Sequence, residues 1–247
     1  MWKFIHKYAS PKVFYDLSLK LSKWFGIACL FFLIIGLYGG LVMAPADYQQ
    51  GDSFRIIYIH VPSAWMSLFI YMIMAISGGM GLIWHTKIAE IIARSSAPIG
   101  ASFTFLALVT GSIWGKPMWG TYWVWDARLT SELILLFLYL GFIALQSAFE
   151  DRRVGARAGA ILALVGIVNI PIIHYSVEWW STLHQGPTVT KFDAPSIDTR
   201  MLIPLILMTL AFKTYYATVL LIRSRSEILQ YECNTSWVKQ LIEGKSV

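Results

Sequence analysis

Six stretches of this 247-residue chain are apolar enough and long enough to cross a lipid bilayer. A hydrocarbon core of about 30 Å needs roughly 20 apolar residues in helical conformation. The stretches are residues 24–43, 61–84, 95–115, 129–149, 158–177 and 201–222. Because a lipid-exposed backbone must satisfy its own hydrogen bonds, and the alternation typical of membrane β-barrels is absent, each stretch predicts an α-helix. The expected fold class is an all-α integral membrane protein, a single polytopic domain over residues 1–247 with a six-transmembrane-helix bundle.

The composition agrees with a membrane protein. Hydrophobic residues make up 57% of the chain and charged residues only 14%, whereas soluble domains carry roughly 25% charged residues. The first stretch follows a basic segment, as in a signal peptide, but it is longer than a signal-peptide core of roughly 7–15 residues. The glycine pairs Gly36/Gly40 and Gly111/Gly115 have the spacing of close helix packing.

Lysine and arginine in the connecting segments predict the orientation. Fourteen of them fall on the side of the two termini, against five on the side of residues 44–60, 116–128 and 178–200. Positive charge accumulates on the cytoplasmic side of membrane proteins. We therefore expect both termini in the cytoplasm and the three longer segments outside it. The basic charge is then a feature of topology, and it does not indicate nucleic-acid binding.

The most unusual outer region is residues 114–130, called the tryptophan segment below. Four of the chain's eleven tryptophans lie within twelve of its residues, namely Trp114, Trp119, Trp123 and Trp125. Tryptophan favours the membrane–water interface, so an aromatic belt is one interpretation. The other is a flat aromatic platform for a large planar ligand, because indole rings offer area and stacking geometry.

Two histidines accompany this segment on the outer side. His60 precedes the second span, and His184 lies in the last outer segment. Imidazoles that flank an aromatic floor suit the axial positions of a haem iron. His174 lies within the fifth span, where a histidine is expected to form a helix-packing hydrogen bond.

Charged residues on the same side suit the haem propionates. Arg55 and Arg128 are the candidates, because a guanidinium can bind a carboxylate through two parallel hydrogen bonds. Asp126 is expected to fix Arg128 or to orient the backbone of the tryptophan segment. Arg200, near a span end, is expected to be a solvated loop charge.

The run of residues 119–130, Trp-Gly-Thr-Tyr-Trp-Val-Trp-Asp-Ala-Arg-Leu-Thr, resembles the signature of the tryptophan-rich "WWD" family of haem-handling proteins. With six spans and histidines in both flanking outer segments, the whole chain resembles the haem exporter C branch of that family, which serves system I cytochrome c maturation. The resemblance implies that His60 and His184 are the axial ligands of haem b bound without a covalent link. It also implies that the four tryptophans of the segment, with Asp126, form the surface that presents haem.

The same resemblance implies partners and a location. Haem would be delivered to a membrane-anchored periplasmic haem chaperone within an ABC-type complex. Its other members would be an ATPase, a permease-like membrane subunit and a small single-span subunit. The chain itself would be no enzyme; it contains no phosphate-binding loop and no C-x-x-C-H motif for covalent haem. The expected location is the bacterial inner membrane, with several spans in the lipid bilayer and the haem site facing the periplasm.

Two other functions stay open from the residues alone. A b-type cytochrome that carries electrons across the membrane would need histidines within its spans, and His174 is the one that lies clearly inside. A permease subunit of an ABC exporter would show intramembrane charges along its path. Glu132 is expected near a span end, so Lys213 is the main candidate for such a charge.

Overall fold

The computed structural model describes residues 10–180, 182–184, 186, 189 and 194–244. Six segments within these residues are long and apolar enough to cross a membrane, so the predicted six-helix membrane architecture is confirmed. The helices are α2 (Pro11–Tyr38), α3 (Ile57–Trp84), α4 (Lys87–Trp119), α5 (Ala127–Ala148), α6 (Arg152–Gly166), α7 (Asn169–Trp179), α8 (Thr199–Tyr231) and the short α9 (Ser236–Ile242). Helices α6 and α7 together make the fifth span.

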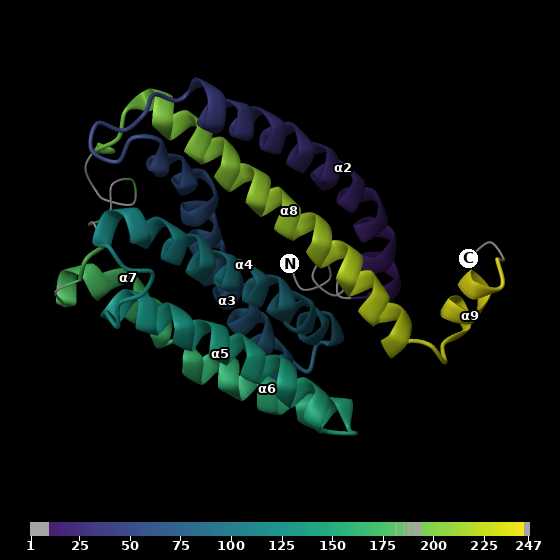
Figure 1. Ribbon diagram of the computed structural model, residues 1–247. Coiled ribbons are helices and arrows are strands. Elements are labelled where there is room, and N and C mark those ends of the chain that lie inside the picture. The colour runs from purple at the N-terminus through teal and green to yellow at the C-terminus, as the bar shows by residue number, and fades with distance from the viewer. Residues whose placement is uncertain (1–9, 181, 185, 187–188, 190–193, 245–247) are drawn as a thin grey trace.

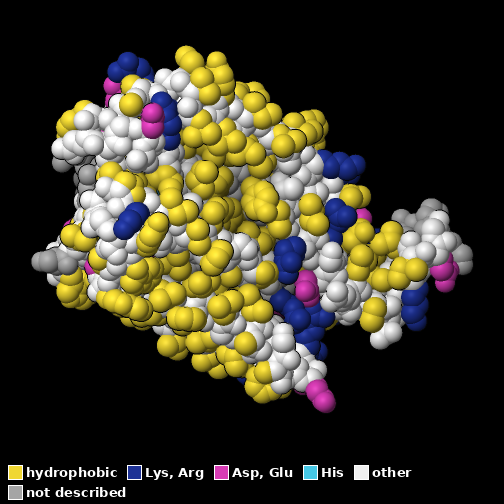
Figure 2. All heavy atoms as spheres, in the orientation of Figure 1, with side chains coloured by type: hydrophobic (Ala, Val, Ile, Leu, Met, Phe, Trp, Pro, Cys, Tyr) yellow, Lys and Arg dark blue, Asp and Glu magenta, His cyan; other side chains and the backbone are white. Residues whose placement is uncertain are grey.

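The spans form a bundle in which α2 lies along α8, α3 along α4, and α5 along α6 (Figure 1). Helix α3 is central, because it packs against α4, α6 and α8. Residues 44–56, 120–126 and the described part of 180–198 meet at one end of the bundle, which we call the loop end. Hydrophobic side chains cover most of the visible middle of the bundle, and Lys and Arg gather towards the end from which α9 projects (Figure 2).

The fifth span differs from the single helix predicted over residues 158–177. It breaks at residues 167–168, between α6 and α7. Pro171 explains the break: a proline has no N–H to donate, and its ring collides with the carbonyl four residues earlier, which here belongs to Ile167. The result is an 11-residue α7 that can take its own direction towards the loop end.

Aspartates define where three helices begin. The carboxylates of Asp126, Asp151 and Asp198 accept the backbone N–H of Leu129, Arg153 and Arg200, at the starts of α5, α6 and α8. An aspartate at this position satisfies one of the free N–H groups of the first turn. Asp126 therefore fixes where α5 begins within the tryptophan segment.

Ion pairs join three helices at the end opposite the loop end. Glu227 of α8 contacts both Arg94 of α4 and Arg152 of α6. Lys87 pairs with Glu232 at 2.8 Å. This network anchors the basic end of the bundle. Four of the basic residues in the orientation count, Lys3, Lys7, Lys191 and Lys245, lie outside the described residues.

Candidate functional site

His60 lies in the first turn of α3 and turns its ring towards α4. Its Nδ1 is 3.0 Å from the Ala107 carbonyl oxygen and 3.1 Å from Thr110 Oγ1. A carbonyl oxygen only accepts hydrogen bonds, so the proton belongs on Nδ1. The Nε2 atom then keeps its lone pair, which is the form in which an imidazole binds a metal.

The His60 ring fits closely into the surface of α4. A Cβ atom at Gly111 would lie 2.9 Å from His60 Cε1, so only glycine leaves room for the ring. Trp114 closes the other side, with its ring centre 5.6 Å from that of His60 at an angle of 76°. The Trp114 indole N–H donates to Gln50 Oε1 at 2.9 Å, which fixes its orientation.

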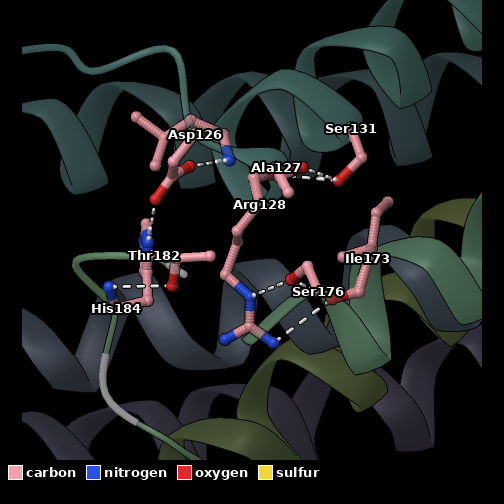
Figure 3. A network of polar contacts seen from close by, with 9 residues as sticks. Asp126, Ala127, Arg128, Ser131, Ile173, Ser176, Thr182 and His184 are labelled. Atoms are coloured by element: carbon pink, nitrogen blue, oxygen red, sulfur yellow. Dashed lines mark hydrogen bonds and ion pairs between the residues drawn. The ribbon is translucent and has the colours of Figure 1, made fainter. Parts of the chain in front are cut away.

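His184 is held by the tryptophan segment. Its Nδ1 lies 3.1 Å from Asp126 Oδ2 (Figure 3). Its ring centre lies 4.8 Å from the ring centre of Trp119. Burial lowers the pKa of His184, and the hydrogen bond with Asp126 offsets part of that effect. The imidazole is therefore neutral at pH 7, with Nδ1–H donating to the carboxylate and Nε2 free to bind a metal.

Asp126 has two separate partners, one for each carboxylate oxygen. Oδ1 accepts the Leu129 N–H at 2.8 Å, and Oδ2 accepts from His184. The first bond orients the backbone of the tryptophan segment, which was one of the two roles expected of Asp126. The second contact, to a residue 58 positions away, was not expected from the sequence.

The two histidines both contact the C-terminal part of α4. His60 lies beside Gly111 and Trp114, and His184 lies beside Trp119. Five residues of helix separate the two tryptophans, which is about 7.5 Å along the axis.

The two arginines expected at the propionates are partly engaged within the protein. Arg55 donates to Asp52 Oδ1 at 2.9 Å and to the Gly40 carbonyl at 2.8 Å. Each of the two bonds comes from a different nitrogen, so two of the three guanidinium nitrogens are used.

Arg128 joins α5 to the end of α7. Its Nε donates to Ser176 Oγ at 3.2 Å, and its Nη2 donates to the Ile173 carbonyl at 3.3 Å (Figure 3). It therefore positions α7 beside the tryptophan segment, whatever else it binds. Arg200 is exposed and pairs with Asp198, as expected of a loop charge.

The tryptophan rings do not form one flat surface. Trp123 and Trp125 lie 5.4 Å apart between ring centres, at an angle of 77°. Trp125 is 77% exposed, whereas the indole nitrogen of Trp123 is buried and has no hydrogen-bond partner among the described residues. The segment thus offers a partly exposed indole, Trp123, and a more exposed one, Trp125, set edge to face in place of a coplanar platform.

Two features at or near this end were missed by the sequence analysis. Tyr175 and Trp179 stack at 5.3 Å on α7, and Trp180 continues the exposed aromatic surface. His174, which was expected to bond between helices, is exposed on α7 beside Tyr175. The adjacent tryptophans Trp179 and Trp180 were the sequence feature that could have indicated this aromatic surface.

Glu132 is the second such feature. It lies near the start of α5, as expected, but it is only 8% exposed, and its carboxylate accepts a hydrogen bond from Ser67 Oγ at 2.7 Å. No sequence pattern near Glu132 indicates Ser67, which lies 65 residues earlier on α3.

Comparisons with known proteins show the family of the chain. The family model described as Heme exporter protein C matches residues 4–239. The chain is 54% identical to the Heme exporter protein C of Haemophilus influenzae, over 98% of this chain and 99% of that protein. It is also 54% identical to the Heme exporter protein C of Escherichia coli K12, over 98% of both chains. A ccmC-like mitochondrial protein of cytochrome c biosynthesis from Marchantia polymorpha is 45% identical over 82% of this chain and 86% of its own length. This chain therefore belongs to the haem exporter protein C family.

Proposed function

We propose that this chain binds haem b without a covalent link at the loop end of the bundle, and hands it to a membrane-anchored periplasmic haem chaperone. Family membership supports the general role, which is haem export and c-type cytochrome maturation by a multi-pass membrane protein. Haem is the cargo of the protein in this proposal. The chain has a handling role, and any ATP hydrolysis belongs to a partner.

One observation carries the proposal: His60 and His184 are prepared for iron in the same way. Each imidazole has its Nδ1 engaged, by the Ala107 carbonyl in one case and by the Asp126 carboxylate in the other. Metal-binding histidines commonly use their second ring nitrogen in this way, because the hydrogen bond sets the tautomer and the ring orientation. The two Nε2 atoms are then the axial ligands.

The surroundings suit a haem that stays only in transit. Trp114 and Trp119 border the two imidazoles, and the exposed Trp125 extends the aromatic surface outwards. Arg55 and Arg128 each have one guanidinium nitrogen beyond those in the bonds described above, and these meet the propionates. A site at the end of the bundle covers much of the ring and leaves an edge open for handover.

The orientation and the partners follow from the same proposal. The loop end faces the periplasm of a bacterial inner membrane, because most Lys and Arg lie towards the other end. The chain works in an ABC-type complex with an ATPase, a permease-like membrane subunit and a small single-span subunit. The tryptophan segment meets the chaperone.

The test is the absorption spectrum of the purified protein with a pyridine haemochrome assay. His60→Ala and His184→Ala are compared with the parent, and His174→Ala is the control, since His174 is exposed near the same end. We expect low-spin haem bands in the parent and in the control, and weakened or shifted bands in the other two variants. Parental spectra in both variants would reject the ligand assignment, and failure to load a purified chaperone would reject the delivery step.

A further inference from the structure

The environment of Lys213 within the described residues does not suit its charge. It lies on α8 and is exposed at the surface of the bundle. From Lys213 to Arg223 is about 15 Å along the helix, and from Lys213 to Arg200 about 20 Å. Arg200 and Arg223 therefore bracket a length close to the roughly 30 Å hydrocarbon core, and Lys213 lies near its centre.

A lysine at this depth cannot reach water along its own side chain. The four-carbon stem spans about 6 Å, less than half the distance to Arg223, so the ammonium group stays within the hydrocarbon region. Charges at the bilayer centre are rare, and they are normally paired or turned to the bundle interior. Lys213 is exposed, so its partner must come from outside this helix.

No described residue neutralises it. The contact that Lys213 makes within the described part of the chain is with the Phe69 ring on α3, whose centre is 5.6 Å from Nζ. Every carboxylate in the described spans lies within five residues of a span end, and the one buried deepest, Glu132, is bonded to Ser67. A second copy of this chain would therefore bring no free carboxylate to Lys213.

The surface around Lys213 is otherwise apolar and formed by two helices. Phe69 on α3 is 43% exposed, and Ile206 and Leu210 on α8 are 45% and 36% exposed. The contact of Phe69 with both Lys213 and Tyr216 shows that α3 and α8 are adjacent here. We call this surface, formed by Phe69, Ile206, Leu210 and Lys213, the lysine face.

We propose that the lysine face binds a transmembrane helix of a different subunit, and that this helix carries an aspartate or glutamate at mid-membrane depth opposite Lys213. The positive charge of Lys213 requires an acidic partner. The apolar residues around Lys213 require that this partner lie on a transmembrane helix. A lipid head group is too far from the bilayer centre to serve. The inference does not depend on the haem site, which lies at the loop end.

The test is photo-crosslinking in native membranes that contain the whole maturation complex. A photoreactive phenylalanine analogue replaces Phe69 or Ile206 on the lysine face. Phe137, which is 60% exposed on α5, is the control position. We expect crosslinks from the first two positions, mapped by mass spectrometry to an apolar segment of another subunit that contains an acidic residue, and none to that segment from Phe137.

Substitutions of Lys213 decide whether the charge matters. Lys213→Met removes the charge and keeps the length, and we expect it to reduce the crosslink yield at least tenfold. Lys213→Arg keeps the charge and should keep the crosslink. Crosslinks to lipid only, to another copy of this chain or to a segment without a carboxylate would overturn the proposal, as would a parental yield in Lys213→Met. Haem spectra of Lys213→Met measure the haem site separately, and they should match the parent.

Discussion

Replacing Asp126 with asparagine tests how His184 is prepared for iron. Asparagine starts a helix as well as aspartate does, so its Oδ1 can keep the Leu129 N–H bond that opens α5. The amide NH₂ then faces His184 Nδ1. Because NH₂ only donates, the imidazole must accept at Nδ1 and carry its proton on Nε2. The atom assigned to the iron loses its lone pair.

The expected magnitudes separate this effect from general damage. Loss of a hydrogen-bond partner behind a metal ligand costs 10–100-fold in affinity, which is about 1.4–2.7 kcal/mol. Thermal stability should change by less than about 0.5 kcal/mol, because the helix cap survives. Asp126→Ala is the comparison: it removes the cap as well, and the cap alone is worth about 1 kcal/mol.

The assay is a haem titration of purified protein, followed at the Soret band, with thermal unfolding followed by circular dichroism. The expected pattern is weaker haem binding by Asp126→Asn at parental stability, and weaker binding with lower stability for Asp126→Ala. If Asp126→Asn bound haem as tightly as the parent, with the same spectrum, then His184 would not depend on Asp126 and its role as ligand would lose its main support.

Two further predictions concern packing. In Gly111→Ala, the new methyl group collides with the His60 ring. We therefore expect about 1–3 kcal/mol lower stability and a shifted haem spectrum. A spectrum like that of the parent would mean that this contact does not hold the ring. In Tyr216→Phe, the buried 2.9 Å bond to Ser96 is lost; we expect about 1 kcal/mol of destabilisation by thermal unfolding, with the partly exposed Tyr215→Phe unchanged as its control.

Hydropathy was sufficient to predict the spans, because a bilayer imposes length and apolarity directly on the sequence. Hydropathy could not predict the break at residues 167–168. A proline such as Pro171 also fits within a continuous transmembrane helix when neighbouring groups satisfy the freed carbonyl. The candidate site residues were selected from the sequence by residue type and by the expected side of the membrane. Their contacts were not, because a hydrogen bond such as Asp126–His184 joins segments 58 residues apart.

Ring orientation was equally out of reach of the sequence. The spacing of Trp123 and Trp125 indicates closeness, but the 77° angle between them depends on how the segment turns before α5. The glycine pair on α4 shows the same limit. Its spacing predicted helix packing, and Gly111 does pack against His60 of α3, whereas the side chain nearest Gly115 is Trp119 of α4 itself.

Helix α4 sets the separation between the two histidines proposed as haem ligands. His60 packs at Gly111 and Trp114, and His184 packs at Trp119, so one rigid element determines their separation. One added or deleted residue between Trp114 and Trp119 would rotate one of these contacts by about 100° relative to the other. This stretch can therefore vary in side chains during evolution, but it cannot vary in length, and natural insertions should fall in residues 44–56 or beyond α7.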